Sequence, residues 1–161
     1  MNGTSIEQNK KIVGQYFTEF WGKGNVDIVD TLCVPDYKMH YPMHGDIVGR
    51  EAAKKMLLDL RTAFPDLTFW PVGPLIAENS VDGDFVVGRW DGGGTHTGPA
   101  FEDLALGELD KPNTGKVMRF TGTTVFRLKD GMIVEEMGEE DALRVCSQLG
   151  VVGPLRWTTS S

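Results

Sequence analysis

The hydrophobic period of the sequence changes at Pro65, and this change restricts the fold more than any other feature. Before Pro65, apolar residues recur at three- and four-residue spacing, which predicts helices over 5–21, 25–33 and 51–64. Ser5 and Gln8 form a possible capping box, and Asn25 is a possible N-cap. A short extended piece over 37–41 separates the second helix from the third.

The chain after Pro65 follows the alternating period of strands. Strands are predicted over 67–77, 85–90, 117–128 and 132–137, and Asp82-Gly83 and Asp130-Gly131 are hairpin turn signals. A short helix over 141–149 follows. Helices first and hairpin-linked strands afterwards predict an α+β fold, in which a curved, mostly antiparallel sheet wraps the N-terminal helices into a cone with an internal cavity.

Length and composition favour one domain. A chain of 161 residues with 40% hydrophobic and 24% charged residues can build a single core. We expect one domain over 1–161, with its core at about 6–151 and a short flexible tail over 152–161. The irregular stretch 92–116 is long for a compact domain, and such loops are usually lids or binding loops.

Charge and cysteine content exclude several classes of partner. The net charge of −7, without a basic cluster, argues against nucleic acid binding. Cys33 and Cys146 lie far apart in apolar patterns, which indicates buried thiols in a reducing compartment. No signal sequence is visible at the N-terminus, and no apolar run reaches the roughly 18 residues of a membrane span, so we expect a cytoplasmic protein without a membrane partner.

A succession of short motifs resembles the SnoaL-like polyketide cyclase family, whose members are often called ester cyclases and have a nuclear transport factor 2-like fold. In chain order the motifs are Tyr16-Phe17, Trp21 to Asn25, Pro35-Asp36-Tyr37 with His40, Ala63 to Leu67, Gly94 to Gly98, Thr114 to Lys116, Phe126 to Leu128, Asp130 to Glu136, Asp141 to Leu143 and Gln148 to Gly150. The resemblance covers about residues 8–151.

The resemblance implies a pocket without cofactor that catalyses ring closure, isomerisation, dehydration or epoxide opening on a small lipophilic metabolite, usually in a homodimer. Ring-closing members place a general acid/base on the final strand, and that position here is Gly138. A histidine of the neighbouring strand corresponds to Thr124, and an insertion between Gly98 and Thr114 lengthens the loop over the cavity mouth. The departures at Gly138 and Thr124 put the polyketide-closing reaction itself in doubt, and the insertion suggests a differently shaped substrate.

Strand alternation divides the polar candidates between two faces. Arg89 and Asp91 share a face with Phe85 and Val87, which makes a polar pocket floor or, equally, an ion pair at the sheet edge. The first arrangement is similar to that of limonene epoxide hydrolases, in which an arginine and two carboxylates activate water. The third of those positions again falls at Gly138.

Glu136 is the first choice for a catalytic acid/base, because only one of Glu135 and Glu136 can face inward and the family register selects Glu136. A carboxylate in an apolar cavity has a raised pKa, which suits proton transfer near neutral pH. The alternative is a solvated strand carboxylate.

The early strand adds Lys38 and His40, which the family register turns towards the cavity. His40 would shuttle a proton or bind a substrate oxygen, and Lys38 would stabilise an enolate. The alternative for His40 is a hydrogen-bonded wall residue. His96, within a Gly-rich run, binds substrate or caps its loop, and His44 is predicted to be a surface loop residue.

Other chemistries find little support in the sequence. Pro42 prevents a helix that would place His40 and His44 on one metal ion, no Gly-x-Ser-x-Gly elbow is present, and the glycine run at 92–94 lacks the Lys and Ser/Thr of a phosphate loop. No metal and no cofactor are expected.

The sequence therefore predicts a cyclase or isomerase of specialised metabolism that acts by acid–base catalysis on a polyketide, terpenoid or alkaloid intermediate. Epoxide hydrolysis and a non-catalytic lipophile-binding or dimerisation module are the alternatives. Trp70 and Trp90 would face outwards and suit the homodimer contact. The predicted catalytic residues are Glu136, His40, Asp91 and Arg89, and the predicted substrate-binding residues are Lys38, His96, Thr124, Phe120, Phe17, Trp21 and Met118.

Overall fold

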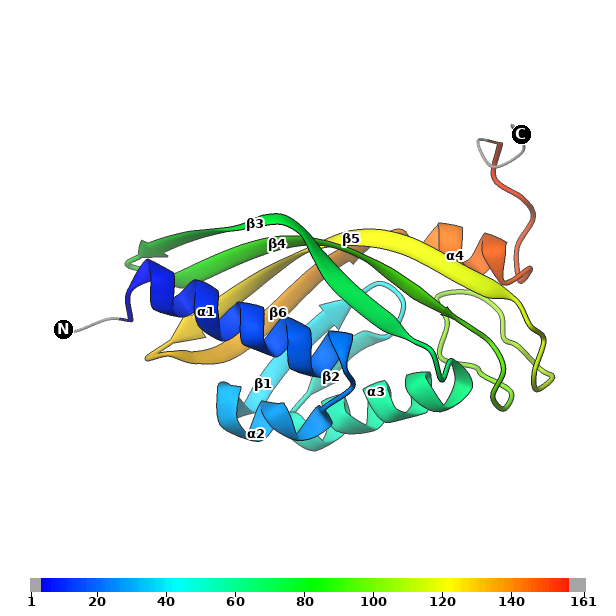
Figure 1. Cartoon of the computed structure of the whole chain (residues 1–161), viewed down its shortest axis with the longest axis horizontal. Coiled ribbons are helices and arrows are strands. Elements are labelled where there is room, and N and C mark those ends of the chain that lie inside the picture. The colour runs from blue at the N-terminus through cyan, green and yellow to red at the C-terminus, as the bar shows by residue number, and fades with distance from the viewer. Residues whose placement is uncertain (1–3, 157–161) are drawn as a thin grey trace.

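A computed structural model describes residues 4–156 of the chain. The α+β class is confirmed, with the helices mainly in the first half and the hairpin-linked strands in the second (Figure 1). In chain order the elements are α1 (Ile6–Tyr16), η1 (Phe17–Gly22), η2 (Val26–Ile28), α2 (Val29–Leu32), β1 (Cys33–Tyr41), β2 (Gly45–Val48), α3 (Arg50–Ala63), β3 (Thr68–Ser80), β4 (Gly83–Thr95), β5 (Val117–Lys129), β6 (Met132–Glu140) and α4 (Ala142–Gln148).

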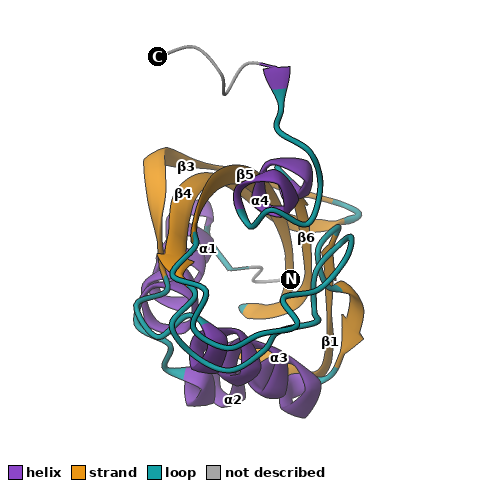
Figure 2. Cartoon of the chain, turned by 90° about the vertical axis from the view of Figure 1, so that its right-hand side faces the viewer, coloured by secondary structure: helices purple, strands orange, loops and turns teal. Residues whose placement is uncertain are grey.

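The six strands form one sheet in the order β2-β1-β6-β5-β4-β3. Every neighbouring pair is antiparallel except β1 and β6, which run parallel. Register shifts interrupt the β3–β4, β5–β6 and β1–β6 ladders, and such bulges increase local bending. The sheet consequently curls around the helices on its concave side (Figure 2).

The two predicted hairpins are confirmed. Asp130 and Gly131 both have positive φ, 51° and 75°, as the tight turn between β5 and β6 requires. β3 and β4 meet at Ser80 and Gly83, where the Ser80 hydroxyl donates to the Gly83 carbonyl at 3.0 Å.

The first helix begins as predicted but changes its winding before it ends. The Ser5 hydroxyl accepts from the Gln8 amide at 3.1 Å, and from Phe17 to Gly22 the helix is a π-helix. Inward-facing apolar residues continue through both parts: Ile12, Val13, Tyr16, Phe17, Phe20 and Trp21 are all buried.

The predictions for both ends of the second helix are wrong. The second helix ends at Leu32, Cys33 already belongs to β1, and Asn25 makes no cap hydrogen bond but donates to Glu19 at 3.2 Å. The short strand β2 was not predicted. Both cysteines are buried and free, as expected.

The irregular stretch predicted from Gly92 begins only at His96, because β4 continues through the three glycines to Thr95. A Cβ on Gly92 would lie 2.3 Å from the Phe69 ring, and one on Gly93 would lie 2.0 Å from the Met118 carbonyl oxygen. Glycine therefore serves here to admit close neighbours and not to form a loop.

The tail predicted over 152–161 lies partly outside the described residues, which end at Arg156. Within 152–156, the Val152 amide donates to the Cys146 carbonyl at 3.4 Å. None of the described helices is long and apolar enough to cross a membrane.

Candidate active site

Glu136 faces the interior of the cone, as predicted, and is fully buried. Its carboxylate accepts hydrogen bonds from the Tyr16 hydroxyl at 2.6 Å, the Tyr41 hydroxyl at 2.6 Å and the Trp21 indole N–H at 2.8 Å. The three donors come from α1, η1 and β1, so the carboxylate joins three separate elements.

Burial and hydrogen bonding have opposite effects on Glu136. Desolvation raises the pKa of its carboxyl, and the bonds from Tyr16, Tyr41 and Trp21 lower it, with desolvation the larger effect. Burial and the neighbouring Glu136 together raise the pKa of Tyr16 and of Tyr41 well above the usual tyrosine value. These hydroxyls therefore remain protonated and act as donors to Glu136.

An apolar cavity lies beside this cluster, but Glu136 itself does not border it. The space open to the centres of water-sized molecules is about 20 Å³, which holds about one water molecule. The ten lining residues come from helices, strands and the turn after β1: Phe17, Trp21, Tyr41, Met43, His44, Leu60, Phe69, Trp90, Phe120 and Glu140.

Three of the predicted substrate-binding residues, Phe17, Trp21 and Phe120, line the cavity. Met118 is buried in the core but is not part of the lining. Thr124 is fully buried and connects the lining residues: its hydroxyl oxygen accepts from the Trp90 indole N–H at 2.9 Å and lies 3.0 Å from the Tyr41 hydroxyl.

The position of Gly138 explains how the chain accommodates these rings. A Cβ on Gly138 would lie 1.9 Å from the Tyr41 ring, and one on Gly122 would lie 2.2 Å from the Trp90 ring. The place where the family resemblance implies an acidic side chain is therefore occupied by the ring of Tyr41. An acid at position 138 is incompatible with this placement of Tyr41.

The polar part of the cavity is formed by two residues that the sequence analysis did not select, His44 and Glu140. The prediction that His44 is a surface residue is wrong: its side chain is 3% exposed, and its Nδ1 lies 2.6 Å from Asp103 Oδ2. The turn after β1 folds inward because the Met43 amide donates to Glu140 Oε1 at 2.8 Å.

Strand alternation contains the signal for Glu140. Glu136, Gly138 and Glu140 share one face of β6, so the inward direction of Glu136 also selects Glu140. Burial raises the pKa of the Glu140 carboxyl, while the Met43 amide and the nearby His44 oppose this shift. No comparable pattern marks Asp103, which lies in the connection between β4 and β5.

Lys38 and His40 lie on the outer face of β1, so their predicted inward orientation is wrong. The inward residues of this strand are Tyr37, Met39 and Tyr41, which are all buried. His40 instead contacts Asp46 on β2, with 2.8 Å between Nδ1 and Oδ1, and Glu135 on β6, with 3.0 Å between Nε2 and Oε1.

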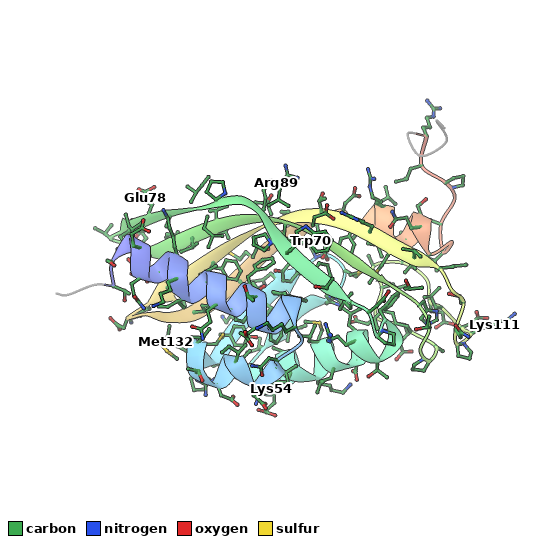
Figure 3. All side chains as sticks on the ribbon, in the orientation of Figure 1. Lys54, Trp70, Glu78, Arg89, Lys111 and Met132 are labelled. Carbon is green, nitrogen blue, oxygen red and sulfur yellow. The ribbon has the colours of Figure 1, made fainter. Side chains whose placement is uncertain are left out.

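Arg89 also lies on the outer face, away from the helices (Figure 3). Asp91, two residues further along β4, shares this face. Asp91 pairs with Arg119 at 3.2 Å, and this bond lowers the pKa of the Asp91 carboxyl. The prediction that Trp90 faces outwards is also wrong. Trp90 lies between Arg89 and Asp91, so its side chain takes the opposite face of β4 and is buried in the cavity wall. Trp70 is 38% exposed, as predicted, with the Arg119 guanidinium 5.0 Å from its ring centre.

His96 is fully buried but does not line the cavity. Its Nε2 donates to the Pro99 carbonyl at 2.6 Å, and its Nδ1 lies 2.8 Å from the Thr114 hydroxyl. The ring therefore joins the two ends of the connection between β4 and β5, as the loop-capping alternative predicted. Within residues 4–156, no cluster of three or more His, Cys, Asp or Glu side chains could hold a metal ion.

Comparison with known proteins agrees with this architecture. Residues 11–149 match the sequence profile of the SnoaL-like polyketide cyclase family. A search of curated proteins found no significant match.

Several solved structures are similar over nearly the whole chain. A candidate polyketide cyclase from Acidithiobacillus ferrooxidans is 30% identical, with a TM-score of 0.69 and coverage of 91% of this chain and 97% of the other. A candidate SnoaL-like polyketide cyclase from Jannaschia sp. CCS1 is 26% identical, with a TM-score of 0.69 and coverage of 94% and 99%. TsrD from Streptomyces laurentii shares the fold at 20% identity, with a TM-score of 0.71 and coverage of 92% and 99%. On the extent of the profile match, the chain belongs to the SnoaL-like polyketide cyclase family.

Proposed function

We propose that this protein is a cofactor-independent cyclase or isomerase that acts by general acid–base catalysis on a small lipophilic metabolite. The observation that carries the proposal is an apolar, ring-lined cavity that contains His44 and Glu140 and no other ionisable side chain except Tyr41. An enclosed apolar pocket with a few convergent polar groups is the usual form of a small-molecule site. The substrate would be a polyketide, terpenoid or alkaloid intermediate.

His44 is proposed as the general base. Its Nδ1 donates to Asp103, an arrangement that fixes the tautomer and leaves Nε2 as the proton acceptor. Among the described residues, no group forms a hydrogen bond to this Nε2. A substrate C–H next to a carbonyl would lose its proton to Nε2.

Glu140 is proposed as the partner acid. Its raised pKa keeps a larger share of the carboxyl protonated near neutral pH than for a solvated glutamate. Glu140 would donate its proton to the substrate carbonyl oxygen as His44 takes the C–H proton, which gives an enol. After the ring closes or the double bond moves, His44 would give its proton to the product, and the enol O–H would return a proton to Glu140. Both groups then regain their starting protonation states, so no cofactor is required.

Glu136 is proposed to position the cavity wall and not to transfer protons. It lies outside the lining, and both of its oxygens accept hydrogen bonds. Two of its donors, Trp21 and Tyr41, are lining residues. Glu136 therefore fixes the orientation of two rings against which a substrate would pack.

Turnover with variants of the polar pair tests this function. Candidate oxygenated intermediates are incubated with the protein, and products are identified by mass spectrometry. Glu140→Gln and His44→Asn are each expected to reduce turnover about 10²- to 10⁴-fold. Glu139→Gln is the matched control, since Glu139 is the exposed neighbour of Glu140. Full turnover by both test variants would refute their assigned roles.

A non-catalytic lipophile-binding module is the second candidate, and it is favoured by the Tyr41 ring at Gly138, where ring-closing relatives carry an acid. It predicts that ligands raise the melting temperature without any product. Epoxide opening loses its support, because Arg89 and Asp91 lie on the outer face.

A further inference from the structure

The closed cavity is too small for a lipophilic metabolite, so part of its wall must move before a substrate can enter. Its space of about 20 Å³ holds about one water molecule, and the side chain of His44 is only 3% exposed. Eight of the ten lining residues lie on helices or strands, whereas Met43 and His44 lie in the turn after β1. The end of the cavity at His44 is therefore the part that regular secondary structure does not close.

A loop of residues 102–108, which we call the Asp103 loop, contacts His44 through Asp103. It belongs to the connection between β4 and β5, at the end of the molecule opposite the N-terminus (Figures 1 and 2). At its neck the buried residues Phe101 and Leu109 exchange both backbone hydrogen bonds, at 2.9 and 2.8 Å. Every residue between them is exposed or half-buried. A surface loop with such close ends is an Ω-loop, which can move as a unit while its neck stays paired.

Side-chain hydrogen bonds hold the Asp103 loop in place. His44 Nδ1 donates to Asp103 Oδ2 at 2.6 Å, and the Cys146 thiol of α4 lies 3.7 Å from the Leu106 carbonyl oxygen, to which it donates. An open groove of about 470 Å³ lies between the connection and α3, and Asp103 is one of its lining residues. Asp103 therefore stands between His44, in the closed cavity, and open space into which the loop can move.

The closed loop affects both members of the proposed acid–base pair. The bond to Asp103 keeps a proton on His44 Nδ1 and leaves Nε2 as the proton acceptor. Burial, and to a smaller extent the negative charge of Asp103, raise the pKa of the Glu140 carboxyl. Withdrawal of Asp103 would leave His44 without its orienting partner and would reduce the protonated share of Glu140.

We propose that the Asp103 loop opens to admit the substrate and that its return sets His44 in the orientation of a base. This inference rests on the proposed function, because it assigns a positioning residue, Asp103, to the same acid–base pair. Proton transfer is then confined to the closed state, in which the substrate is separated from bulk water.

The two buried cysteines report opening of the loop without any substrate. Cys146 contacts the loop, whereas Cys33 is buried in the core at the start of β1. The full chain is treated with iodoacetamide under native conditions, and mass spectrometry of its peptides gives the alkylation rate of each thiol. We expect Cys146 to react at least about 10²-fold faster than Cys33, because opening of the loop costs less free energy than the global unfolding that exposes Cys33.

Loss of the bond between His44 and Asp103 should favour the open loop. Asp103→Ala is expected to raise the alkylation rate of Cys146 about 5- to 20-fold. Glu102→Ala removes the neighbouring charge from the same loop and should leave the rate within about twofold of wild type. If Asp103→Ala does not fold, as judged by circular dichroism, His44→Phe takes its place, because it keeps a ring and removes the same bond.

The nitrogen-15 shifts of the His44 ring test its orientation, which a purely structural role of Asp103 would not change. The His44 signals are assigned by their absence from His44→Phe. In the neutral ring, we expect Nδ1 to carry the proton in wild type and in Glu102→Ala. The form protonated at Nε2 should gain population in Asp103→Ala.

The possible failures are distinguishable. Equal alkylation rates for Cys146 and Cys33 in wild type would refute opening of the loop. Equal effects of Asp103→Ala and Glu102→Ala would assign loop closure to overall charge and refute the role of the bond to His44. A His44 ring protonated at Nε2 in wild type would refute its orientation by Asp103. Alkylation does not depend on turnover, so full activity of His44→Asn would refute the proposed function without deciding whether the loop opens.

Discussion

The carboxylate of Glu136 remains in an apolar interior because three donors from three elements reach it. Replacing it by glutamine removes the charge, and it turns an N–H group towards groups that donate to the carboxylate in the wild type. We expect Glu136→Gln to lower the free energy of unfolding by about 2–4 kcal/mol. Urea denaturation measures the loss, and Glu139→Gln, on the exposed side of the same strand, should stay within about 0.5 kcal/mol of wild type. A loss no larger than the control's would mean that the cluster does not hold the fold together.

Position 138 must be glycine because the Tyr41 ring packs directly against its backbone. A methyl group at this position would overlap the Tyr41 ring, which is held in turn by Glu136 and Thr124. Gly138→Ala is expected to cost about 1–3 kcal/mol of stability, because the ring has little freedom to withdraw.

Thermal unfolding of this variant and of Gly153→Ala provides the comparison. A Cβ at Gly153 meets nothing within 4 Å, and so the control should be nearly neutral. Equal melting temperatures for the two variants would show that the Tyr41 ring moves aside at no cost.

The sequence predicted which residues share a face, but at several strands it did not predict which face is inside. On β6 the inward orientation predicted for Glu136 was right. On β1 the family register favoured Lys38 and His40, although the opposite face, with Tyr37, Met39 and Tyr41, carries the larger apolar side chains. On β1 the large hydrophobic side chains predict the inward face better than the family register does, because their burial contributes most of the favourable free energy of folding.

At the scale of elements, helices and hairpins were predictable because their signals are local. Ser5, Pro65 and Asp130-Gly131 each mark a boundary through the backbone of a few residues. β2 escaped prediction because its residues, 45–48, are mostly exposed and the strand exists only through pairing with β1. The polar site brings together segments that are far apart in the sequence, the turn at His44 and the connection at Asp103. No local sequence pattern therefore predicts it.

His40 links three neighbouring strands on the outer face. It lies on β1 between Asp46 of β2 and Glu135 of β6, and Arg127 of β5 pairs with the same Glu135. Asp46, with a smaller contribution from Glu135, raises the pKa of His40 above its ordinary value, against a lowering by burial.

This shift predicts a pH dependence of stability. Because the folded-state pKa lies above the unfolded value of about 6.5, the stabilisation is complete below about pH 6.5 and is lost as the pH rises through the folded-state pKa. The free energy of unfolding of wild type, relative to His40→Gln, should therefore fall from about pH 6.5 upward. Urea denaturation at several pH values measures the difference. A stability difference between wild type and His40→Gln that does not change with pH would contradict a stabilising contact between protonated His40 and the carboxylates of Asp46 and Glu135.

At the scale of the whole molecule, the outer side of β3 carries an exposed apolar strip, beside the charged residues Arg89 and Asp91 of β4. Trp70, Val72 and Ile76 on β3 are 38%, 47% and 68% exposed. β3 is an edge strand, but Pro71 and Pro74 interrupt it and discourage strand-to-strand addition. A partner would therefore use the face of the sheet and not its edge.

We propose that two copies of the chain associate through this outer face. Ile76→Glu places a charge on the most exposed residue of the apolar strip, and two-fold symmetry brings the strip of one copy against that of the other. We expect light scattering coupled to size-exclusion chromatography to give the mass of a dimer for wild type and of a monomer for Ile76→Glu. Val81→Glu is the control, because Val81 is fully exposed at the tip of the β3–β4 hairpin, outside the strip, and adds the same charge. A monomeric wild type, or a dimer that both variants leave intact, would refute association through the outer face, and the exposed apolar strip would then need another partner.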